Sequence, residues 1–171
     1  MLVKSFAAAV QGISATLITV EVNCSKGVQF FLVGLPDVAV RESHERIISA
    51  LQVSGYTFPR NRIVVNMAPA DIRKEGSAYD LPLAVGIQPD RLSDYLLMGE
   101  LSLDGSLNPI KGALPIAIKA REEGFKGFIL PKQNAREAAV VNNLEVYGVE
   151  NLKEVLLFME GKKELEPTVV D

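Results

Sequence analysis

Alternating apolar and polar side chains predict β-structure at the beginning of the chain. Residues 2–10, 15–22 and 29–33 are predicted strands, separated by turns at Gln11-Gly12 and at Ser25-Lys26-Gly27. The second strand has a β-branched residue at every other position from Thr16 to Val22, which is typical of a half-buried strand. We expect these three strands to pair in chain order as a meander.

The apolar period then changes to that of a helix. Between residues 38 and 53 apolar side chains recur at helical spacing, and Asp37 is placed to cap the helix that they predict. Gly55 ends this helix, and residues 61–67 form the next predicted strand. A strand, a helix and a second strand in this order predict a parallel pair joined by a crossover.

Residues 99–110 have the pattern of a β-hairpin. Leu101 and Leu103 alternate with polar neighbours, and Asp104-Gly105 is a strong tight-turn signal. We therefore expect a two-residue turn at Asp104-Gly105 and a buried hairpin face that carries Leu101 and Leu103.

A helix over residues 113–123 and a buried strand over 126–130 follow the hairpin. Leu114, Ala117 and Ile118 fall on one helix face, which we expect to pack against the hairpin. The remaining predicted elements are a helix over 78–87 with Pro82 in its first turn, a segment over 92–98 that leads into the hairpin, a helix from Asn134 to 141, a strand over 144–149 and a helix from Asn151 to 159. Pro167 excludes a helix from the acidic segment 161–171, which we interpret as a linker.

Composition narrows the class of protein. The chain has 171 residues, 48% of them hydrophobic, and a net charge of −3, which predicts one well-packed domain and argues against a protein that coats nucleic acid. The single cysteine, Cys24, excludes an internal disulfide. No apolar run reaches the roughly eighteen residues that a membrane span needs, and we expect no signal peptide and a cytoplasmic location.

Few residues suggest catalysis or metal binding. His44 is the only histidine and lies within a predicted helix without a second histidine or a cysteine cluster, so we expect a surface position and no metal site. No nucleophile elbow accompanies it, and Cys24 is expected to be a small, half-buried residue. The chain has no P-loop, so it is not expected to bind ATP by itself.

Two other groups of residues give alternative functions. Arg60, Arg62, Arg73 and Lys74 flank one predicted strand and could contact phosphates, or they could form a solvated edge. Ser77, at the entrance of a helix, and Lys111, from the hairpin–helix unit, outline a Ser-Lys hydrolase.

Four stretches, taken in order, resemble the amino-terminal domain of the ComM-like (YifB-like) proteins, which are Mg-chelatase-related AAA+ ATPases. These stretches are Val33-Gly34-Leu35-Pro36-Asp37 with Arg41-Glu42-Ser43, Val64-Val65-Asn66-Met67-Ala68-Pro69-Ala70-Asp71, Gly76-Ser77-Ala78-Tyr79-Asp80-Leu81-Pro82-Leu83-Ala84, and Gly99-Glu100-Leu101-Ser102-Leu103-Asp104-Gly105. The hairpin–helix–strand unit is also similar to that of the Lon protease domain and of the RadA carboxy-terminal domain.

The resemblance implies an α/β (α+β) fold, the two-layer sandwich of ribosomal protein S5 domain 2. It implies a domain over residues 1–160 and a linker over 161–171 towards an AAA+ module, which would use ATP and Mg²⁺ in a hexameric ring that acts as a DNA helicase in branch migration. Ala78 and Leu114 fall where Lon has its serine and its lysine, so the resemblance implies vestigial catalytic positions. The segment 86–90 is shorter than expected for the family.

The sequence thus predicts a non-catalytic Lon-like domain that aids ring assembly and presents DNA or another substrate. Its expected partners are its own AAA+ module, neighbouring subunits and DNA, which it would bind weakly and without sequence preference. The chain is expected to bind no cofactor or metal and not to associate with a membrane. A Lon-like peptidase that uses Ser77 and Lys111 is the alternative.

Overall fold

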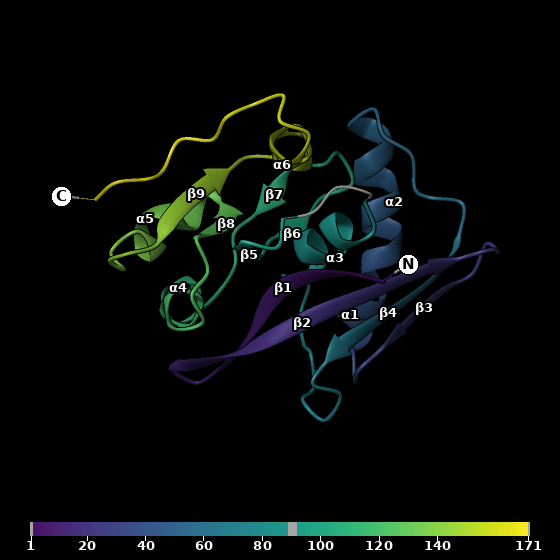
Figure 1. Cartoon of the computed structure of the whole chain (residues 1–171), viewed down its shortest axis with the longest axis horizontal. Helices are drawn as coiled ribbons and strands as arrows, with labels where there is room; N and C mark the ends of the chain where they lie inside the picture. The colour runs from purple at the N-terminus through teal and green to yellow at the C-terminus, as the bar shows by residue number, and fades with distance from the viewer. Residues whose placement is uncertain (1, 89–91, 171) are drawn as a thin grey trace.

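A seven-stranded mixed sheet forms the centre of the molecule (Figure 1). The computed structural model describes residues 2–88 and 92–170. The strand order is β3-β4-β2-β1-β5-β8-β9, and a separate hairpin is formed by β6 and β7. The strands are β1 Leu2–Gln11, β2 Ser14–Ser25, β3 Phe30–Val33, β4 Arg62–Ala68, β5 Tyr95–Leu97, β6 Glu100–Leu101, β7 Leu107–Asn108, β8 Gly127–Pro131 and β9 Glu145–Val149.

The helices lie on the sheet in two groups. They are α1 Val38–Arg41, α2 Ser43–Val53, α3 Asp80–Gly86, α4 Ala113–Glu122, the 3-10 turn η1 Lys132–Asn134, α5 Ala135–Ala138 and α6 Leu152–Met159. Figure 1 shows α2 and α3 on one face of β1, β2, β4 and β3, whereas α4 and α5 lie across β8 and β9 from α6. The burial agrees with this arrangement, because β4 alternates between buried and half-buried residues and β8 is buried at every position.

The expected α/β class and the crossover are confirmed, but the meander is wrong for the third strand. β1 and β2 pair antiparallel over their whole length. β3 pairs in parallel with β4, and β4 lies between β3 and β2. The crossover through α2 thus decides the strand order, because a parallel partner for β3 must come from the far end of that helix.

The turn of the second hairpin also differs from the expectation. Leu101 pairs with Leu107, so five residues connect the strands instead of two. Gly105 adopts a φ of +89°, and its N–H donates to the Ser102 carbonyl, as a longer turn requires. Leu101 is buried, whereas Leu103 is exposed, so these two residues do not share a buried face.

Two of the three side chains that were predicted to cap the start of a helix do so. Asp37 accepts a hydrogen bond from Val40 N–H, and Asn151 accepts one from Glu154 N–H, as expected for caps. Asn134 instead exchanges two hydrogen bonds with the backbone of Ile110 and so fixes the end of the hairpin. The first predicted helix is divided at Glu42 into α1 and α2.

The carboxy-terminal segment 161–170 has no helix. The Thr168 N–H donates to the Val146 carbonyl of β9, and Leu165 packs against the core. In the segment 86–90, Gly86, Ile87 and Gln88 are buried, and residues 89–90 lie outside the described residues. No helix in the described ranges has both the length and the apolar character that crossing a membrane demands.

Candidate functional site

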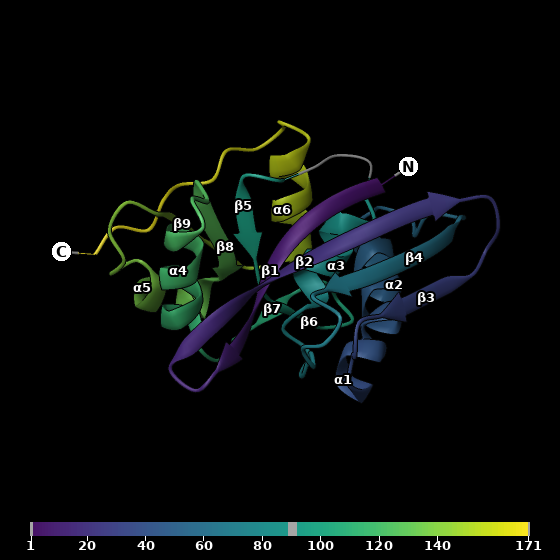
Figure 2. The same cartoon turned by 60° about the horizontal axis from the view of Figure 1, so that its bottom comes forward.

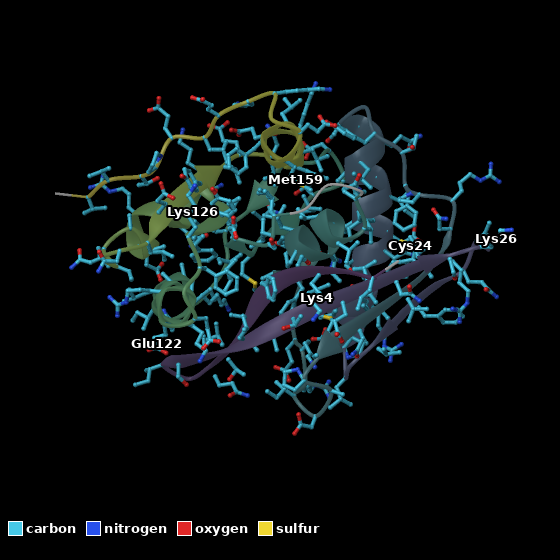
Figure 3. All side chains as sticks on the ribbon, viewed as in Figure 1. Lys4, Cys24, Lys26, Glu122, Lys126 and Met159 are labelled. Carbon is cyan, nitrogen blue, oxygen red and sulfur yellow. The ribbon has the colours of Figure 1, made fainter. Side chains whose placement is uncertain are left out.

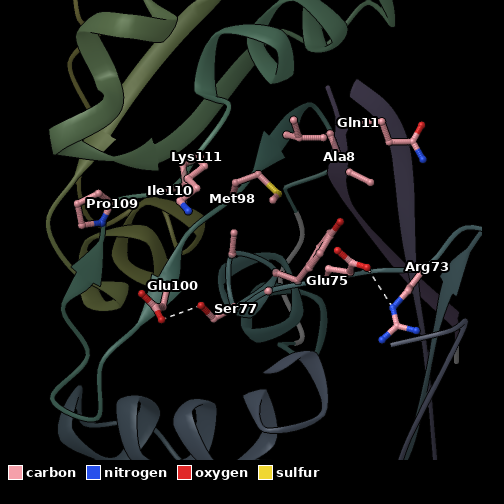
Figure 4. A pocket seen from close by; sticks show the side chains of 15 residues that line it. Ala8, Gln11, Arg73, Glu75, Ser77, Met98, Glu100, Pro109, Ile110 and Lys111 are labelled. Carbon is pink, nitrogen blue, oxygen red and sulfur yellow. Dashed lines mark hydrogen bonds and ion pairs between the residues drawn. The ribbon is translucent and has the colours of Figure 1, made fainter. Parts of the chain in front are cut away.

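A groove lies where the end of β1 faces the segment before α3 and the segment before α4 (Figure 4). We call it the Ser77 groove, and its volume is about 690 Å³. Its walls are formed by residues 8–11, 75–79 and 109–111, together with Arg73, Met98 and Glu100. The fold therefore brings Ser77, Ala78 and Lys111, which are distant in the sequence, to one cavity.

The hydroxyl of Ser77 is held by a carboxylate. Ser77 Oγ donates a hydrogen bond of 2.7 Å to Glu100 Oε1 at the start of β6. The backbone fixes this position, because Gly99 N–H donates to the Ala78 carbonyl and Leu81 N–H donates to the Gly99 carbonyl. A serine hydroxyl has one proton to donate, and a Ser-Lys dyad requires the lysine amine to accept it. The observed hydrogen bond directs that proton to Glu100.

The remaining expected catalytic positions do not form a reactive pair. Lys111 lines the groove from the opposite wall, and the residue is solvent-exposed, so it is not the desolvated lysine that activates the serine of a Ser-Lys dyad. Ala78 also lines the groove, whereas Leu114 is not among its lining residues. Leu114 is half-buried in the first turn of α4, and its N–H donates to Glu137 Oε2. Tyr79 is buried beside Ser77, and this burial raises the pKa of its phenol.

The prediction that Lys74 could contact phosphates is wrong. Its side chain is fully buried, and Nζ donates to the carbonyls of Gly34 and Pro69. Its backbone also pairs with Leu35 and Asp37, so this lysine ties the loop after β3 to the loop after β4. A buried ammonium held by carbonyls cannot meet a phosphate, and the role of Lys74 is structural.

The three arginines of that expected surface lie in different places. Arg60 is exposed just before β4, and the Arg62 guanidinium lies over the Phe31 ring at 5.2 Å from its centroid. Arg73 lies beyond the other end of β4, lines the Ser77 groove and forms an ion pair of 3.1 Å with Glu75. Because β4 separates the two groups by roughly 20 Å, they do not form one compact basic patch.

An ion pair with a buried carboxylate adjoins the groove, because Asp80 follows the lining residue Tyr79 and binds Leu101, which follows the lining residue Glu100. Arg46 Nε and Nη2 donate to the two carboxylate oxygens of Asp80 at 2.6 and 2.9 Å, and Leu101 N–H donates to the same carboxylate at 3.0 Å. Arg46 Nη2 also donates to the Ala39 carbonyl. The pair therefore joins α1, α2, α3 and β6 at one point.

The pKa values of both partners are raised, which disfavours the charged form of Asp80 and favours the charged form of Arg46. Burial raises the pKa of the Asp80 carboxyl, which disfavours the carboxylate, and the hydrogen bonds from Arg46 and Leu101 oppose this shift. The hydrogen bond to Asp80 raises the pKa of Arg46, which favours the charged guanidinium. We take the pair as ionised at neutral pH. Three N–H donors point at the two oxygens of the Asp80 carboxylate, so a proton on either oxygen would face one of these donors.

His44 is less exposed than expected. Its ring stacks on Phe30 with centroids 4.2 Å apart and also contacts Phe58, so it belongs to an aromatic cluster between α2 and the sheet. Burial lowers the pKa of His44, and Glu45 opposes this shift. Cys24 is half-buried, as expected. Among residues 2–88 and 92–170, no three His, Cys, Asp or Glu side chains come together in a way that could hold a metal ion.

Sequence reasoning missed Glu100, Arg46 and Asp80 as parts of this site. Asp80 carried a signal, because a single carboxylate stands among Tyr79 and the apolar residues of α3, and a buried carboxylate needs a cationic partner. Glu100 carried none, since its contact with Ser77 joins residues 23 positions apart.

The chain is similar to several known proteins. The family model described as subunit ChlI of Mg-chelatase matches residues 20–134. Competence protein ComM of Haemophilus influenzae is 38% identical over 168 residues, which cover 94% of this chain and 33% of that protein. The uncharacterized protein YifB of Escherichia coli is 40% identical over 163 residues, which cover 91% of this chain and 32% of YifB.

A more distant similarity concerns a protease. Lon protease 2 of Bacillus subtilis is 28% identical over 120 residues, which cover 67% of this chain and 22% of the protease. The chain thus spans about a third of the length of ComM and YifB, and less of the protease.

Proposed function

This chain belongs to the Mg-chelatase ChlI family as a ComM/YifB-like domain, and we propose that it is a non-catalytic domain of a longer, ring-forming AAA+ ATPase. Its proposed role is to aid assembly of the ring and to present DNA or another substrate to the motor. In this proposal the parent protein is a cytoplasmic DNA helicase or branch-migration motor. ATP and Mg²⁺ act in the part of the parent protein that lies outside this chain.

The observation that carries the proposal is the hydrogen bond from Ser77 to Glu100. The chain shares a distant similarity with a Lon protease, and Ser77, Ala78 and Lys111 line one groove. In that groove the serine donates to a carboxylate, the neighbouring position is alanine and the lysine is exposed. A nucleophile needs an adjacent base that accepts its proton, so this arrangement favours a binding or structural role over hydrolysis.

A firm connection between elements supports an assembly role. Three groups join segments that are far apart in the sequence: the Arg46–Asp80 pair, the buried Lys74 and Asn134. Groups that are held by several buried hydrogen bonds keep one geometry, and a domain in a ring needs surfaces that do not change between subunits.

The proposal is tested on the full-length protein. A variant that lacks residues 2–160 is compared with the full-length protein for particle mass by light scattering, ATP hydrolysis and branch migration of a DNA four-way junction. We expect the truncated protein to hydrolyse ATP but to lose stable rings and branch migration. Normal assembly and branch migration by the truncated protein would overturn the proposal, as would the absence of a Walker A motif outside this chain.

A matched point variant tests the non-catalytic part. Ser77→Ala in the full-length protein should leave assembly and branch migration unchanged, because alanine removes only the hydroxyl. Loss of either activity in this variant would show that the Ser77 hydroxyl has a chemical role.

A further inference from the structure

Strand β1 has an open edge beside the Ser77 groove. Within the described residues β1 pairs with β5 only at Phe6, although β1 continues to Gln11. Figures 1 and 2 show this last part of β1 and its turn extending away from β5. Residues 8–11 line the Ser77 groove, so the groove lies beside the part of β1 that β5 does not cover.

The register of β1 and β2 decides which backbone groups face this edge. Gln11 and Ser14 flank a two-residue turn, so they form a hydrogen-bonded pair, and such pairs recur at every second residue along the strand. Ala8 and Val10 occupy the alternate positions, whose N–H and C=O groups point away from β2. Phe6 belongs to the same alternate set, and it does pair with β5 on that side. The edge from Ala8 to Val10 therefore offers strand-forming groups.

The segment after β5 does not continue the pairing with β1. In a continued parallel ladder the Gly99 N–H would donate to the Ala8 carbonyl, but it donates to the Ala78 carbonyl at 2.8 Å. Outside the strand ladders, no backbone hydrogen bond in the described part of the chain includes Ala8 or Val10. An unpaired strand edge is a template for a further strand.

The charged side chains of the groove also indicate what it accepts. Arg73 and Glu75 pair with each other, and Glu100 accepts the hydrogen bond from Ser77. Lys111 is the remaining charged residue of the groove, and no ion pair among residues 2–88 and 92–170 includes it. Figure 4 shows Lys111 on the side of the groove away from Arg73 and Glu75. A ligand that brings one carboxylate to Lys111 complements these charges.

Lys111 lies close to the open edge. Its neighbour Gly112 approaches β1 so closely that a Cβ at this position would lie 2.7 Å from Val10 Cγ2. Gly112 also has a φ of +76°, and glycine permits both the close approach and this conformation. One ligand can therefore reach the edge of β1 and Lys111 together.

We propose that the Ser77 groove binds an extended polypeptide segment, which adds a strand to the open edge of β1 and places an acidic side chain at Lys111. Backbone hydrogen bonds to Ala8 and Val10 supply affinity, and Lys111 supplies the preference for an acidic residue. The inference rests on the proposed role in presenting a substrate to the motor, and it names an extended polypeptide as that substrate.

A polypeptide fits this groove better than nucleic acid does. The groove contains two carboxylates, Glu75 and Glu100, beside its two cations, so it has no excess of positive charge to hold a phosphate backbone. Alternating N–H and C=O groups on a strand edge match the backbone of a second strand. Met98 and Ile110, which also line the groove, provide apolar surface for the neighbouring side chains of that strand.

Fluorescence anisotropy with the 171-residue chain tests this binding. The probe is a BODIPY-labelled heptapeptide of alternating serine and valine with one central glutamate, capped at both ends so that the glutamate is its only carboxylate. We expect it to bind about two- to fivefold more tightly than the same peptide with glutamine, as an exposed ion pair allows. A peptide N-methylated at every amide should not bind, because it has no N–H to donate to β1.

Two pairs of variants separate the backbone contact from the charge contact. Val10→Pro removes the N–H at the open edge without removing a hydrogen bond to β2, and it should weaken binding by about fivefold or more. Val10→Ala retains the N–H and should weaken binding less. Lys111→Ala should abolish the preference for glutamate over glutamine, whereas Lys126→Ala should retain it, because Lys126 is exposed outside the groove (Figure 3). Urea midpoints establish that each variant is folded, and if Val10→Pro is not, the N-methylated peptide decides the backbone contact.

Several results would overturn the inference. Equal binding of the glutamate and glutamine peptides would remove the role of Lys111, and binding of the N-methylated peptide would exclude an added strand. Displacement of the peptide by an oligothymidine that binds more tightly would identify a nucleic-acid groove instead.

The outcome for the proposed function is read separately. If no peptide binds but removal of residues 2–160 abolishes rings and branch migration, the substrate class is wrong and the proposed function stands. Specific peptide binding combined with normal assembly and branch migration by the truncated protein would overturn the proposed function alone.

Discussion

Arg46 and Asp80 form a two-pronged ion pair in the interior, with Arg46 Nε 2.6 Å from Asp80 Oδ2 and Arg46 Nη2 2.9 Å from Asp80 Oδ1. Asp80 is fully buried, and Leu101 N–H is its third donor. The pair connects α2, which carries Arg46, to α3, which carries Asp80, and to strand β6, which supplies Glu100. The geometry of the groove therefore depends on it.

Removing Arg46 alone should lower the free energy of unfolding more than replacing both Arg46 and Asp80 by neutral residues. Arg46→Met is expected to lower the free energy of unfolding by roughly 3–5 kcal/mol, because it leaves a buried carboxylate without its cation. Arg46→Met/Asp80→Asn should be more stable than Arg46→Met alone, since the amide can still accept from Leu101 N–H. Urea denaturation at neutral pH measures both, and an equal midpoint for the two variants would show that the pair is not coupled.

Ser77 should be unreactive. Its proton is donated to Glu100 and Lys111 is exposed, so a serine-reactive fluorophosphonate should not label Ser77 and the chain should not cleave casein. Mass spectrometry of the treated chain reads out the first expectation. Labelling at Ser77 that disappears in Lys111→Ala would establish the Ser-Lys hydrolase instead.

Lys74 and Arg73 are neighbours in the sequence and should respond differently to replacement by alanine. Lys74→Ala is expected to lower the unfolding free energy by about 1–3 kcal/mol or more, because it leaves buried carbonyls without a donor. Arg73→Ala should leave stability unchanged, because Arg73 and its partner Glu75 are exposed.

Two arginine variants examine DNA binding. We expect the chain to bind DNA weakly and without sequence preference at physiological salt, and each phosphate contact that is lost should reduce the salt slope by about 0.9. Arg60→Ala or Arg73→Ala, measured by fluorescence anisotropy on a duplex, would show such a change if these side chains contact phosphates. Tight binding that survives high salt would contradict the expectation.

Two residues of α4 provide a matched test of its orientation. Ile116 is fully buried and Leu114 is half-buried, although Leu114 was expected on the buried face. Ile116→Ala should cost roughly 2–5 kcal/mol of unfolding free energy, and Leu114→Ala should cost less than that range because part of its surface is already in water. Urea midpoints decide the order, and a larger loss for Leu114→Ala would mean that the helix is rotated relative to this structure.

His44 should make stability depend on pH. Burial lowers its pKa below 6.5, so the folded state prefers the neutral ring. Its contribution to stability is therefore complete above pH 6.5 and is lost as the pH falls through the lowered pKa of the folded state. No other histidine is present in the sequence.

The control for this effect is His44→Phe, which retains a ring beside Phe30 and Phe58 and cannot take up a proton. Between pH 7 and pH 5, urea midpoints of the unsubstituted chain should fall more steeply than those of His44→Phe. Parallel curves for the two proteins would show that His44 is not coupled to folding.

Local chemistry allowed several features to be predicted from the sequence. Asp37 and Asn151 cap helices as expected, because a cap needs only a side-chain oxygen and the next few backbone N–H groups. The parallel pairing of β3 with β4 follows from the length of the crossover between them. The family resemblance also came from contiguous stretches, and the match to the Mg-chelatase ChlI family confirms it.

Only the tertiary structure decided the features that depend on distant partners. Lys74 looked like a surface cation beside Arg73, yet the loops after β3 and β4 close over it and supply two carbonyls. Leu103 follows the alternation of Leu101 and is nevertheless exposed, because the connection has five residues and turns it outwards. Glu100 receives the Ser77 hydrogen bond only because the segment before α3 and the start of β6 meet across the groove. Hydrophobic period and turn chemistry act over a few residues, whereas burial and proton acceptors come from segments that only the completed fold brings into contact.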